Sequence, residues 1–382
     1  MDFNNKDDIY LKQPVLISTL TNKIFPLDYI EEFTDEGESL EVLLPDIKKA
    51  KIKEGETIWQ RFSDFLLFSE KDETLNLGEG NTSLLIANQK LQEFTGIKNL
   101  FLKNETQNPT WSFKDRGSLT TLYMAKKMGE KFTATISSGN MGHSIAAYGA
   151  KAGIKVIVFV PEFTPDEKIY PMLFHGANVF KVRADDYSEM KKFVLNLAKK
   201  VKLRIVSGNG PIRTEGYKVT AFEMFEQLQN QVPDYIAVPT SACGHIRGIF
   251  KGYRELFEAG LIKKLPRMIV VQAENNSPIV SAIKQNKGHI IPFSNFHTIA
   301  EAITSGNPMG GDEIIQKTKQ YKWLAESVTE EEIIVAQQKF GEGGYFVEPA
   351  TATSLYAVKK LRESQLIEKD ASVVLLLTGT GL

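Results

Sequence analysis

The sequence predicts an α/β protein with two domains, each built on a twisted, parallel-rich sheet flanked by helices. Strand-like and helix-like segments alternate from about residue 92 onward, as in chains whose sheets are covered by helices on both faces. Several strand-like segments are continuous apolar runs, typical of strands buried on both sides. The 382 residues exceed what one core of ordinary size needs, so we expect two domains.

The predicted elements follow one another closely. A β-rich segment at 99–105 precedes a helix at 113–130, whose apolar residues recur at helical spacing. A second group comprises strands at 132–137, 154–161 and 178–182, with helices at 139–152 and near 166–175. Further strands are expected in the segments LRIVS, DYIAVP, RMIVVQAE and SVVLLLTG, at 203–207, 234–239, 267–274 and 372–379.

The first 80 residues are richer in acidic residues and lack this alternation. The stretch FTDEGESLEVLLPDIKKA at 33–50 indicates a short hairpin, or a strand followed by a helix. We expect an N-terminal appendage leading into the core at 1–90, a small domain at 91–225 and a large domain at 226–382. The last boundary is placed near 220–232, where an amphipathic segment ends in QNQVPD.

Composition excludes several classes of partner. The formal net charge of -1 does not favour nucleic acid or a membrane surface, and no apolar run approaches the ~20 residues that span a bilayer. The first residues, MDFNNKDDIYLKQ, indicate neither a secretory signal nor a transit peptide. The single cysteine, Cys243, excludes an internal disulfide and fits a cytoplasmic protein. The five histidines lack metal-ligand spacing, so we expect no metal.

Four junctions at strand ends are rich in glycine, serine, threonine or asparagine. Ligands of open α/β sheets bind beyond the carboxyl ends of strands, so the coincidence of four such junctions predicts a binding site. Each has a plainer interpretation when taken alone, such as a serine helix cap in the second. The junctions are NPTWSFKDRG (108–117), SSGNMGHS (137–144), PTSACGHIRG (239–248) and TGTGL (378–382).

Lys114 lies at the start of its predicted helix, where the helix dipole disfavours a cation by ~0.3–1 kcal/mol. A surface lysine is the plainer interpretation, but a lysine kept from water there has a depressed pKa and can form a Schiff base. The junction at 239–248 can hold a phosphate on helix N–H groups, although it lacks both GxxxxGK[ST] and GxGxxG. Cys243 and His245 lie only two positions apart and no third group is seen to orient them, so a packed cysteine is favoured over a thiol nucleophile.

Taken together, these motifs resemble those of the pyridoxal-phosphate (PLP) enzymes of fold type II, the tryptophan synthase β-subunit family, and most closely its threonine synthase branch. NPTWSFKDRG is similar to the family's lysine motif NPTGSFKDRG, with Trp111 in place of glycine. The resemblance covers nearly the whole chain. It extends to LGEGNTSLL (77–85), SSGN (137–140), PIRTEGYKVTAFE (211–223), VEPATATS (347–354) and LTGTGL (377–382).

The resemblance implies a role for each matched residue. Lys114 would bond PLP as a Schiff base with Phe113 beside it, Asn140 would bind the 3′-hydroxyl, and Thr378 would bind the pyridine nitrogen. The PLP phosphate would lie on the N–H groups of Ser241, Ala242, Cys243, Gly244 and His245. Substrate would contact Ser137, Ser138, Met141, Arg213 and His245, with Arg213 at its anionic end.

The resemblance further implies a homodimeric lyase that converts O-phosphohomoserine and water to threonine and phosphate. Met141 and His245 depart from the family pattern, which has threonine and asparagine near the substrate phosphate. Losing such a bond costs ~1.5–3 kcal/mol unless it is replaced, and His245 could replace one as a cation. The departures leave open β-replacement on O-phosphoserine, as in cysteate synthase, or an amino-acid ammonia-lyase.

Overall fold

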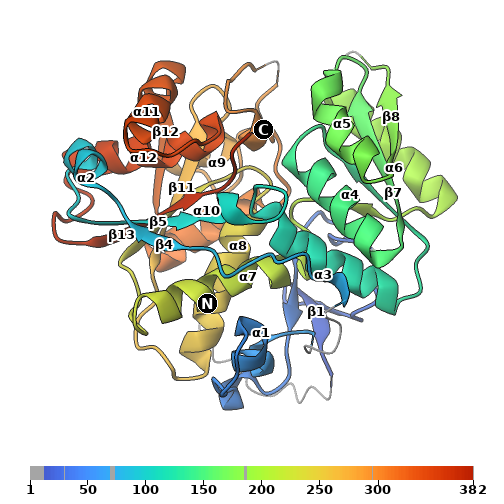
Figure 1. Cartoon of the computed structure of the whole chain (residues 1–382), viewed down its shortest axis with the longest axis horizontal. Coiled ribbons are helices and arrows are strands. Elements are labelled where there is room, and N and C mark those ends of the chain that lie inside the picture. Colours follow the sequence, from blue (N-terminus) through green and yellow to red (C-terminus); the bar gives the residue numbers. More distant parts are fainter. Residues whose placement is uncertain (1–12, 30, 69–73, 185–186, 295, 382) are drawn as a thin grey trace.

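The computed structural model describes residues 13–29, 31–68, 74–184, 187–294 and 296–381. The N-terminal segment 1–12, which the sequence indicates to be no targeting peptide, lies outside the described residues. The described chain forms three sheets, of three, four and six strands. Figure 1 shows the four-stranded sheet and its helices on the right and the six-stranded sheet on the left. The predicted α/β class, with parallel-rich sheets flanked by helices, is confirmed.

The four-stranded sheet is parallel throughout and has the order β8-β7-β6-β9. Its core is formed by apolar residues of the inner strands and of the helix that covers them, including Ile145, Val156 and Val158. The alternation predicted from sequence is therefore present here. The elements are β6 (Phe132–Ile136), α4 (Asn140–Ala152), β7 (Lys155–Pro161), α5 (Asp166–Phe174), β8 (Asn178–Val182), α6 (Tyr187–Val201) and β9 (Ile205–Val206).

The six-stranded sheet has the order β12-β11-β10-β13-β5-β4, and only β4 is antiparallel to its neighbour. Its strands are β4 (Leu84–Ile86), β5 (Asn99–Asn104), β10 (Tyr235–Pro239), β11 (Arg267–Ala273), β12 (Leu324–Val328) and β13 (Ser372–Leu377). Its helices are α2 (Gln89–Thr95), α8 (Gly244–Glu258), α9 (Pro278–Lys284), α10 (Gly311–Tyr321), α11 (Glu330–Glu342) and α12 (Pro349–Glu363).

Both faces of this sheet are buried, which explains why its central strands are continuous apolar runs. Along β10, Ile236 and Val238 belong to the core that includes Phe250 of α8. The alternate residue Ala237 belongs to the opposite core, which includes Leu355 of α12. Each strand therefore contributes side chains to two separate hydrophobic layers.

The structure departs from the sequence-based organisation in two places. β5 lies in the range 91–225 predicted for the small domain, yet it pairs in parallel with β13 over its whole length. Sequence spacing could not reveal this, because the two strands are far apart in the chain. β12, at residues 324–328, was not predicted as a strand. It is an edge strand with only half-buried side chains at Leu324–Glu326, and so lacks the apolar run of its neighbours.

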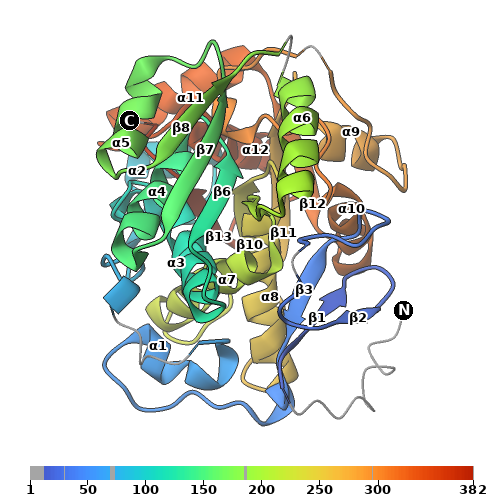
Figure 2. The same ribbon diagram turned by 90° about the vertical axis from the view of Figure 1, so that its right-hand side faces the viewer.

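The N-terminal region forms a three-stranded antiparallel sheet of order β2-β1-β3 and a short helix. The stretch 33–50 supplies one strand followed by a single 3-10 turn, and the partner of that strand lies upstream. Figure 2 shows this sheet beside α8 and α10, where Arg247 donates a hydrogen bond to the carbonyl of Leu40 at 2.8 Å. The elements are β1 (Val15–Ser18), β2 (Ile24–Phe25), β3 (Leu40–Leu43), the turn Ile47–Lys49, α1 (Ile58–Arg61) and the turn Ser63–Phe65.

Three helices pack at backbone contact and hold the site together. α3 (Lys114–Lys127) crosses α7 (Pro211–Gln227) at Gly216, where a Cβ atom would lie 1.9 Å from the carbonyl oxygen of Arg116. α8 crosses α7 at Gly248, where a Cβ atom would lie 2.6 Å from Cβ of Tyr217. Only glycine permits these approaches. They bring the first turns of α3 and α8 to the same part of α7.

Candidate active site

The lysine loop is joined directly to the end of β13. Ser112 and Gly379 form an antiparallel bridge. The N–H of Phe113 donates to the carbonyl of Thr378 at 3.0 Å, and the N–H of Thr380 donates to the carbonyl of Trp111 at 3.2 Å. Backbone hydrogen bonds thus join two of the four junctions predicted from the sequence, those at 108–117 and 378–382.

Lys114 is the first residue of α3, and its side chain is half-buried. Its Nζ atom lies 3.7 Å from the ring centroid of Phe113. Burial and the positive charge of Arg213 lower the pKa of Lys114 to about 7, although the charge of Glu348 opposes the shift. A large fraction of this amine is therefore neutral, and hence nucleophilic, near pH 7.

Asn140 and Thr378 meet at a buried carboxylate, that of Glu348. The amide nitrogen of Asn140 donates to one oxygen of Glu348 at 2.9 Å, and the hydroxyl of Thr378 donates to the other at 3.1 Å. The hydroxyls of Thr351 and Thr378 are 2.6 Å apart. Glu348 lies in the motif VEPATATS, but the sequence motif alone predicted no role for it. The only local sign of such a role is that Glu348 is the N-cap residue of α12, where serine, threonine, aspartate or asparagine is usual, and that its side chain makes no capping bond.

The junction from Ser241 to His245 leads into α8 through a tight turn. Cys243 has a φ of 74°, and a Cβ atom on Gly244 would lie 2.0 Å from the carbonyl oxygen of Gly208. Burial raises the pKa of the Cys243 thiol, which agrees with a packed cysteine rather than a nucleophile. The first N–H groups of a helix have no hydrogen-bond partner within the helix, so the N–H groups of Gly244 and His245 can donate hydrogen bonds to an anion.

His245 is buried, and neither ring nitrogen has a hydrogen-bond partner among the described residues. Its ring stacks on that of Phe113, and the ring of Tyr217 lies edge-on at 5.5 Å. Burial and the charges of Lys114 and Arg116 lower the pKa of His245 well below its usual range. This environment favours the neutral imidazole when no anion is bound, so a cationic His245 beside a substrate phosphate stays a prediction.

Arg213 projects from α7 toward the start of α3 and is buried. Its Nε atom donates to the hydroxyl of Tyr217 at 2.7 Å. Its Nη2 atom donates to the hydroxyl of Ser118 at 2.9 Å and to the carbonyl of Lys114 at 3.3 Å. In the described part of the chain, Nη1 has no hydrogen-bond partner. One donor of this guanidinium therefore remains for an anion.

The chain is similar in sequence to known proteins of one family. A family model described as "Pyridoxal-phosphate dependent enzyme" matches residues 75–379. The chain belongs to this family. Threonine synthase of Methanocaldococcus jannaschii is 37% identical over 338 residues, which are 88% of this chain and 83% of that protein. Threonine synthase of Halalkalibacterium halodurans is 34% identical over 328 residues, covering 85% and 88%.

Solved structures agree with this assignment at the level of the fold. Maize serine racemase has a TM-score of 0.69 at 19% identity, and the match covers 79% of this chain and 89% of that one. A processed threonine deaminase isoform of Solanum lycopersicum has a TM-score of 0.68 at 20% identity, covering 79% and 84%. The predicted family, fold type II and the cofactor PLP are confirmed.

The residues of this PLP enzyme fit the cofactor. The site combines a partly neutral lysine, a helix start with open N–H groups, and buried donors on Arg213 and His245 that lack partners. Asn140 and Thr378 come together at Glu348, whose charge also acts on Lys114. When bound, PLP supplies an electron sink for a carbanion at the substrate's Cα.

In the junction SSGN of this PLP enzyme, the Ser137 side chain bonds to the backbone of its own turn. The hydroxyl of Ser137 accepts hydrogen bonds from the N–H groups of Gly139 and Gly142, at 3.3 and 3.2 Å, and thereby shapes the turn into α4. Ser138 is half-buried on the same turn. Met141 is buried in the core of the four-stranded sheet, with Ile145 and Met172. Its side chain brings no hydrogen-bond donor to a substrate.

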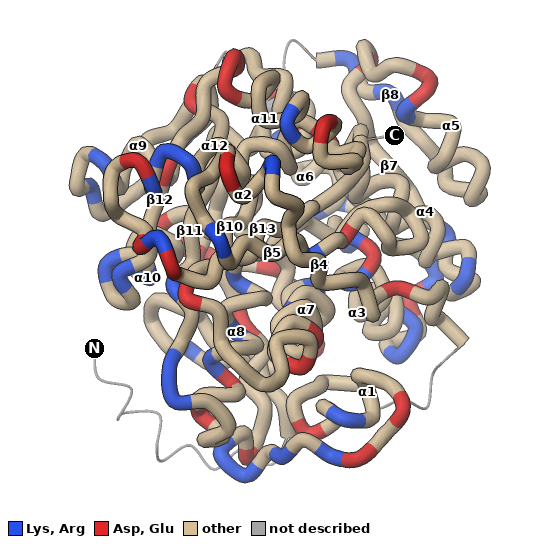
Figure 3. Tube along the Cα trace, turned by 60° about the vertical axis from the view of Figure 1, so that its left-hand side comes forward, with Lys and Arg blue, Asp and Glu red and all other residues tan. Residues whose placement is uncertain are grey.

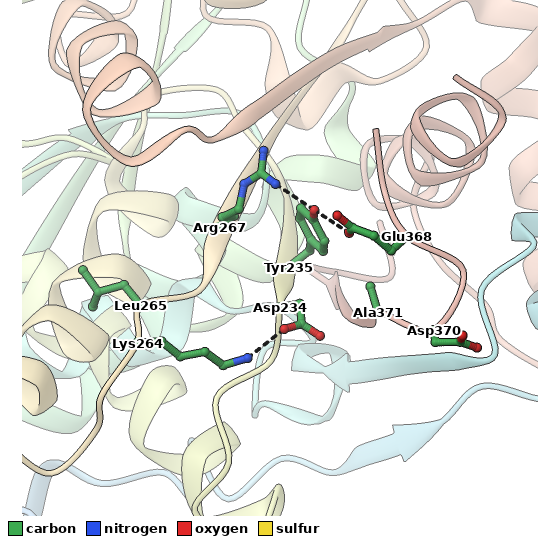
Figure 4. Close-up of a pocket in the computed structure, with 8 residues that line it drawn as sticks. All are labelled: Asp234, Tyr235, Lys264, Leu265, Arg267, Glu368, Asp370 and Ala371. Atoms are coloured by element: carbon green, nitrogen blue, oxygen red, sulfur yellow. Dashed lines mark hydrogen bonds and ion pairs between the residues drawn. The ribbon is translucent and has the colours of Figure 1, made fainter. Parts of the chain in front are cut away.

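A pocket of ≈490 Å³ lies elsewhere, at the amino ends of β10 and β11 (Figure 4). Its charged groups satisfy one another. Lys264 pairs with Asp234 at 2.7 Å, and Arg267 donates to the hydroxyl of Tyr235 at 2.8 Å. Ligands of such sheets bind at the carboxyl ends of strands, where Thr378 lies, so we place the PLP site there and not in this pocket.

Charged residues of both signs are distributed along the described chain. Figure 3 shows lysine and arginine interspersed with aspartate and glutamate along the visible trace. The described residues contain no cluster of histidine, cysteine, aspartate or glutamate suited to a metal ion. Within the same residues, no helix is both long and apolar enough to cross a bilayer.

Proposed function

We propose that this PLP enzyme converts O-phosphohomoserine and water into threonine and phosphate. The names of its relatives, at 34–37% identity over most of the chain, support this reaction. The observation that carries it in the structure is the grouping of Lys114 with buried nitrogen atoms that have no hydrogen-bond partner among the described residues, namely Nη1 of Arg213 and both ring nitrogens of His245. A dianionic substrate would supply the missing acceptors.

The proposed roles follow from these positions. Lys114 would hold the cofactor, and the lowered pKa of its amine suits it to accept the proton from Cα of the substrate. Asn140 and Thr378 orient the cofactor ring, and the segment from Ser241 to His245 holds its phosphate. Nη1 of Arg213 holds the anionic end of the substrate.

The proposed reaction balances without an additional reactant. Cα and Cβ each lose one proton, and phosphate leaves Cγ with the electron pair of the broken C–O bond. Cγ gains a proton and becomes a methyl group. Water then supplies a hydroxyl at Cβ, Cα regains a proton, and the second water proton leaves with the phosphate. Ser137, Ser138 and Met141 line the turn beside these carbons in this proposal.

We also propose that the protein is a homodimer in the cytoplasm. Its chain would consist of an N-terminal appendage at 1–90, a small domain at 91–225 and a large domain at 226–382, and the small domain would move when substrate binds. Closure of the smaller part would exclude bulk water from the reacting carbons. The pairing of β5 with β13 makes residues 99–104 part of the static side of this movement.

A second candidate is β-replacement on O-phosphoserine or amino-acid ammonia-lyase activity. Two observations favour the ammonia-lyase, whose substrate has no phosphate: Met141 offers no donor to a phosphate, and burial lowers the pKa of His245 well below its usual range. The purified holoenzyme given O-phosphohomoserine should release phosphate and threonine in equal amounts, and Lys114→Ala should release neither. Release of neither product by the wild type would overturn the leading proposal. Sulfonate product from O-phosphoserine and sulfite, or ammonia from serine or threonine, would then identify the alternative.

A further inference from the structure

Glu348 is the carboxylate at the centre of the site, and it is buried with a relative exposure of 6%. It is held from both sides of the site. Its oxygens accept hydrogen bonds from Asn140 of α4 and from Thr378 at the end of β13. Its own N–H donates to the carbonyl of Gly379 at 3.1 Å. A buried carboxylate of this kind requires compensating donors or charges.

The bond to Asn140 fixes which way that amide points. An ionised carboxylate only accepts hydrogen bonds, so the amide group that faces Glu348 must be the NH₂ and not the oxygen. The NH₂ has a second hydrogen, which remains for an oxygen of the cofactor. Glu348 therefore selects the donor face of Asn140 for the site.

The bond to Thr378 assigns the single proton of that hydroxyl. With an ionised Glu348, the hydroxyl donates to the carboxylate at 3.1 Å, and its oxygen is left as an acceptor. With a protonated Glu348, the carboxyl donates instead, and Thr378 can offer its proton to the cofactor. Thr351 bonds Thr378 from the other side and carries no charge.

The charges that face this group come from three other helices. Lys114 of α3 acts directly on Glu348. Arg213 of α7 acts on Lys114 and adds positive charge, while His245 of α8 is neutral there. The pKa of Glu348 is raised by burial, and the contacts with Asn140 and the two threonines and the charge of Lys114 offset that shift only in part. An ionised Glu348 in turn raises the pKa of Lys114.

We propose that Glu348 is a positioning residue that orients Asn140 and Thr378 toward PLP and serves as the counter-ion of the PLP–lysine bond. The proposal rests on the family and its cofactor, not on which amino acid is the substrate. It also explains the glycines of the C-terminal motif. A Cβ atom on Gly379 would lie 3.1 Å from Oε1 of Glu348, and one on Gly381 would lie 2.9 Å from its Cβ.

Glu348→Gln tests both parts of the proposal. Glutamine carries no charge and puts an NH₂ donor in place of one acceptor oxygen, so it cannot accept from Asn140 and Thr378 on separate oxygens or balance Lys114. We expect the dissociation constant for PLP, from titration of the apoprotein, to rise ~10-fold or more. In the holoenzyme, the visible band near ~410–420 nm reports the protonated PLP–lysine bond. Its midpoint should fall by about one pH unit or more, since a lost negative charge disfavours the protonated form.

Two further variants separate position from charge. Glu348→Asp keeps the charge with a shorter side chain, so the midpoint should stay near that of the wild type while PLP affinity falls. Thr353→Val removes a buried hydroxyl of the same helix, which bonds the carbonyl of Ala350, so it should leave the midpoint unchanged. An unaltered midpoint and affinity in Glu348→Gln would overturn the proposal, as would equal midpoint shifts in all three variants. If Glu348→Gln does not fold, Glu348→Asp decides through PLP affinity, and wild-type affinity there overturns the positioning role.

Discussion

The ring of His245 stacks on the ring of Phe113, with centroids 3.8 Å apart and planes 11° apart. Nζ of Lys114 lies 3.7 Å from the centroid of the same phenyl ring. Phe113 is therefore in contact with both the reactive amine and the buried imidazole. Burial lowers the pKa of His245 well below its usual range, and the charges of Lys114 and Arg116 lower it further.

Phosphate binding should depend on His245 and on pH. An anion beside His245 raises its lowered pKa, so binding takes up a proton and becomes tighter as pH falls from 8 toward 6. His245→Gln should abolish the proton uptake and weaken phosphate binding ~10-fold. Calorimetric titration of the holoenzyme with inorganic phosphate, in buffers of different ionisation enthalpy, measures both quantities. The exposed His297 provides the control, because His297→Gln should change neither.

Incorporation of PLP should follow the ionisation of Lys114. The amine attacks only when neutral, and its pKa is lowered to about 7. The rate of PLP uptake by the apoprotein should therefore rise about tenfold per pH unit below 7 and level off above it. Arg213→Gln should move the midpoint to higher pH by removing a positive charge, whereas Arg213→Lys should not. A rate that continues to rise through pH 9 in the wild type would contradict this account.

Gly117 should be necessary for the placement of Arg213. Alanine usually stabilises a helix relative to glycine, but a Cβ atom at 117 would lie 2.4 Å from Cγ of Arg213 and 2.7 Å from the ring of Tyr217. We expect Gly117→Ala to lower the free energy of unfolding by ~1–3 kcal/mol and to weaken phosphate binding. Gly341, in α11, has open space around it, so Gly341→Ala should raise the free energy of unfolding by ~0.5–1 kcal/mol. Urea denaturation compares the two, and a harmless Gly117→Ala would refute the packing argument.

Trp111 occupies a backbone position suited to glycine. Its φ is 60°, a left-handed conformation that costs most residues ~1–2 kcal/mol. Its exposed ring gains a tilted contact with His143, with centroids 5.9 Å apart. Relief of strain should offset the added flexibility of glycine, so Trp111→Gly should leave the free energy of unfolding equal or slightly higher. Phe193→Gly, at an exposed aromatic inside α6, should lower it by ~0.5 kcal/mol or more. A larger loss in Trp111→Gly would show that the contact with His143 outweighs the strain.

The sequence was most informative where structure depends on neighbours in the chain. The elements from β6 to β8 were predictable because apolar periodicity sets strand and helix locally. The partnership of β5 with β13 was not, since it depends on which distant strands share a core. β12 was missed for a related reason, because an edge strand does not need an apolar run.

The same distinction holds for the site. Lys114 could be singled out because a lysine at a helix start is electrostatically unusual. Glu348 could not, because its importance arises only when α4, α12 and β13 bring Asn140 and Thr378 to it. The neutral state of His245 was also beyond the sequence, which contains no measure of how deeply the imidazole is buried or how near Lys114 it lies.

The central position of β13 in its sheet constrains the order in which the protein can fold. β13 lies between β10 and β5, so these two strands have no direct pairing with each other. During synthesis, β4 and β5 must wait until the ribosome has delivered residues 372–377 before they join the rest of the sheet. Such long-range parallel pairing slows folding and leaves apolar strand edges open in the meantime. The nascent chain is therefore expected to depend on chaperones until this one strand is inserted.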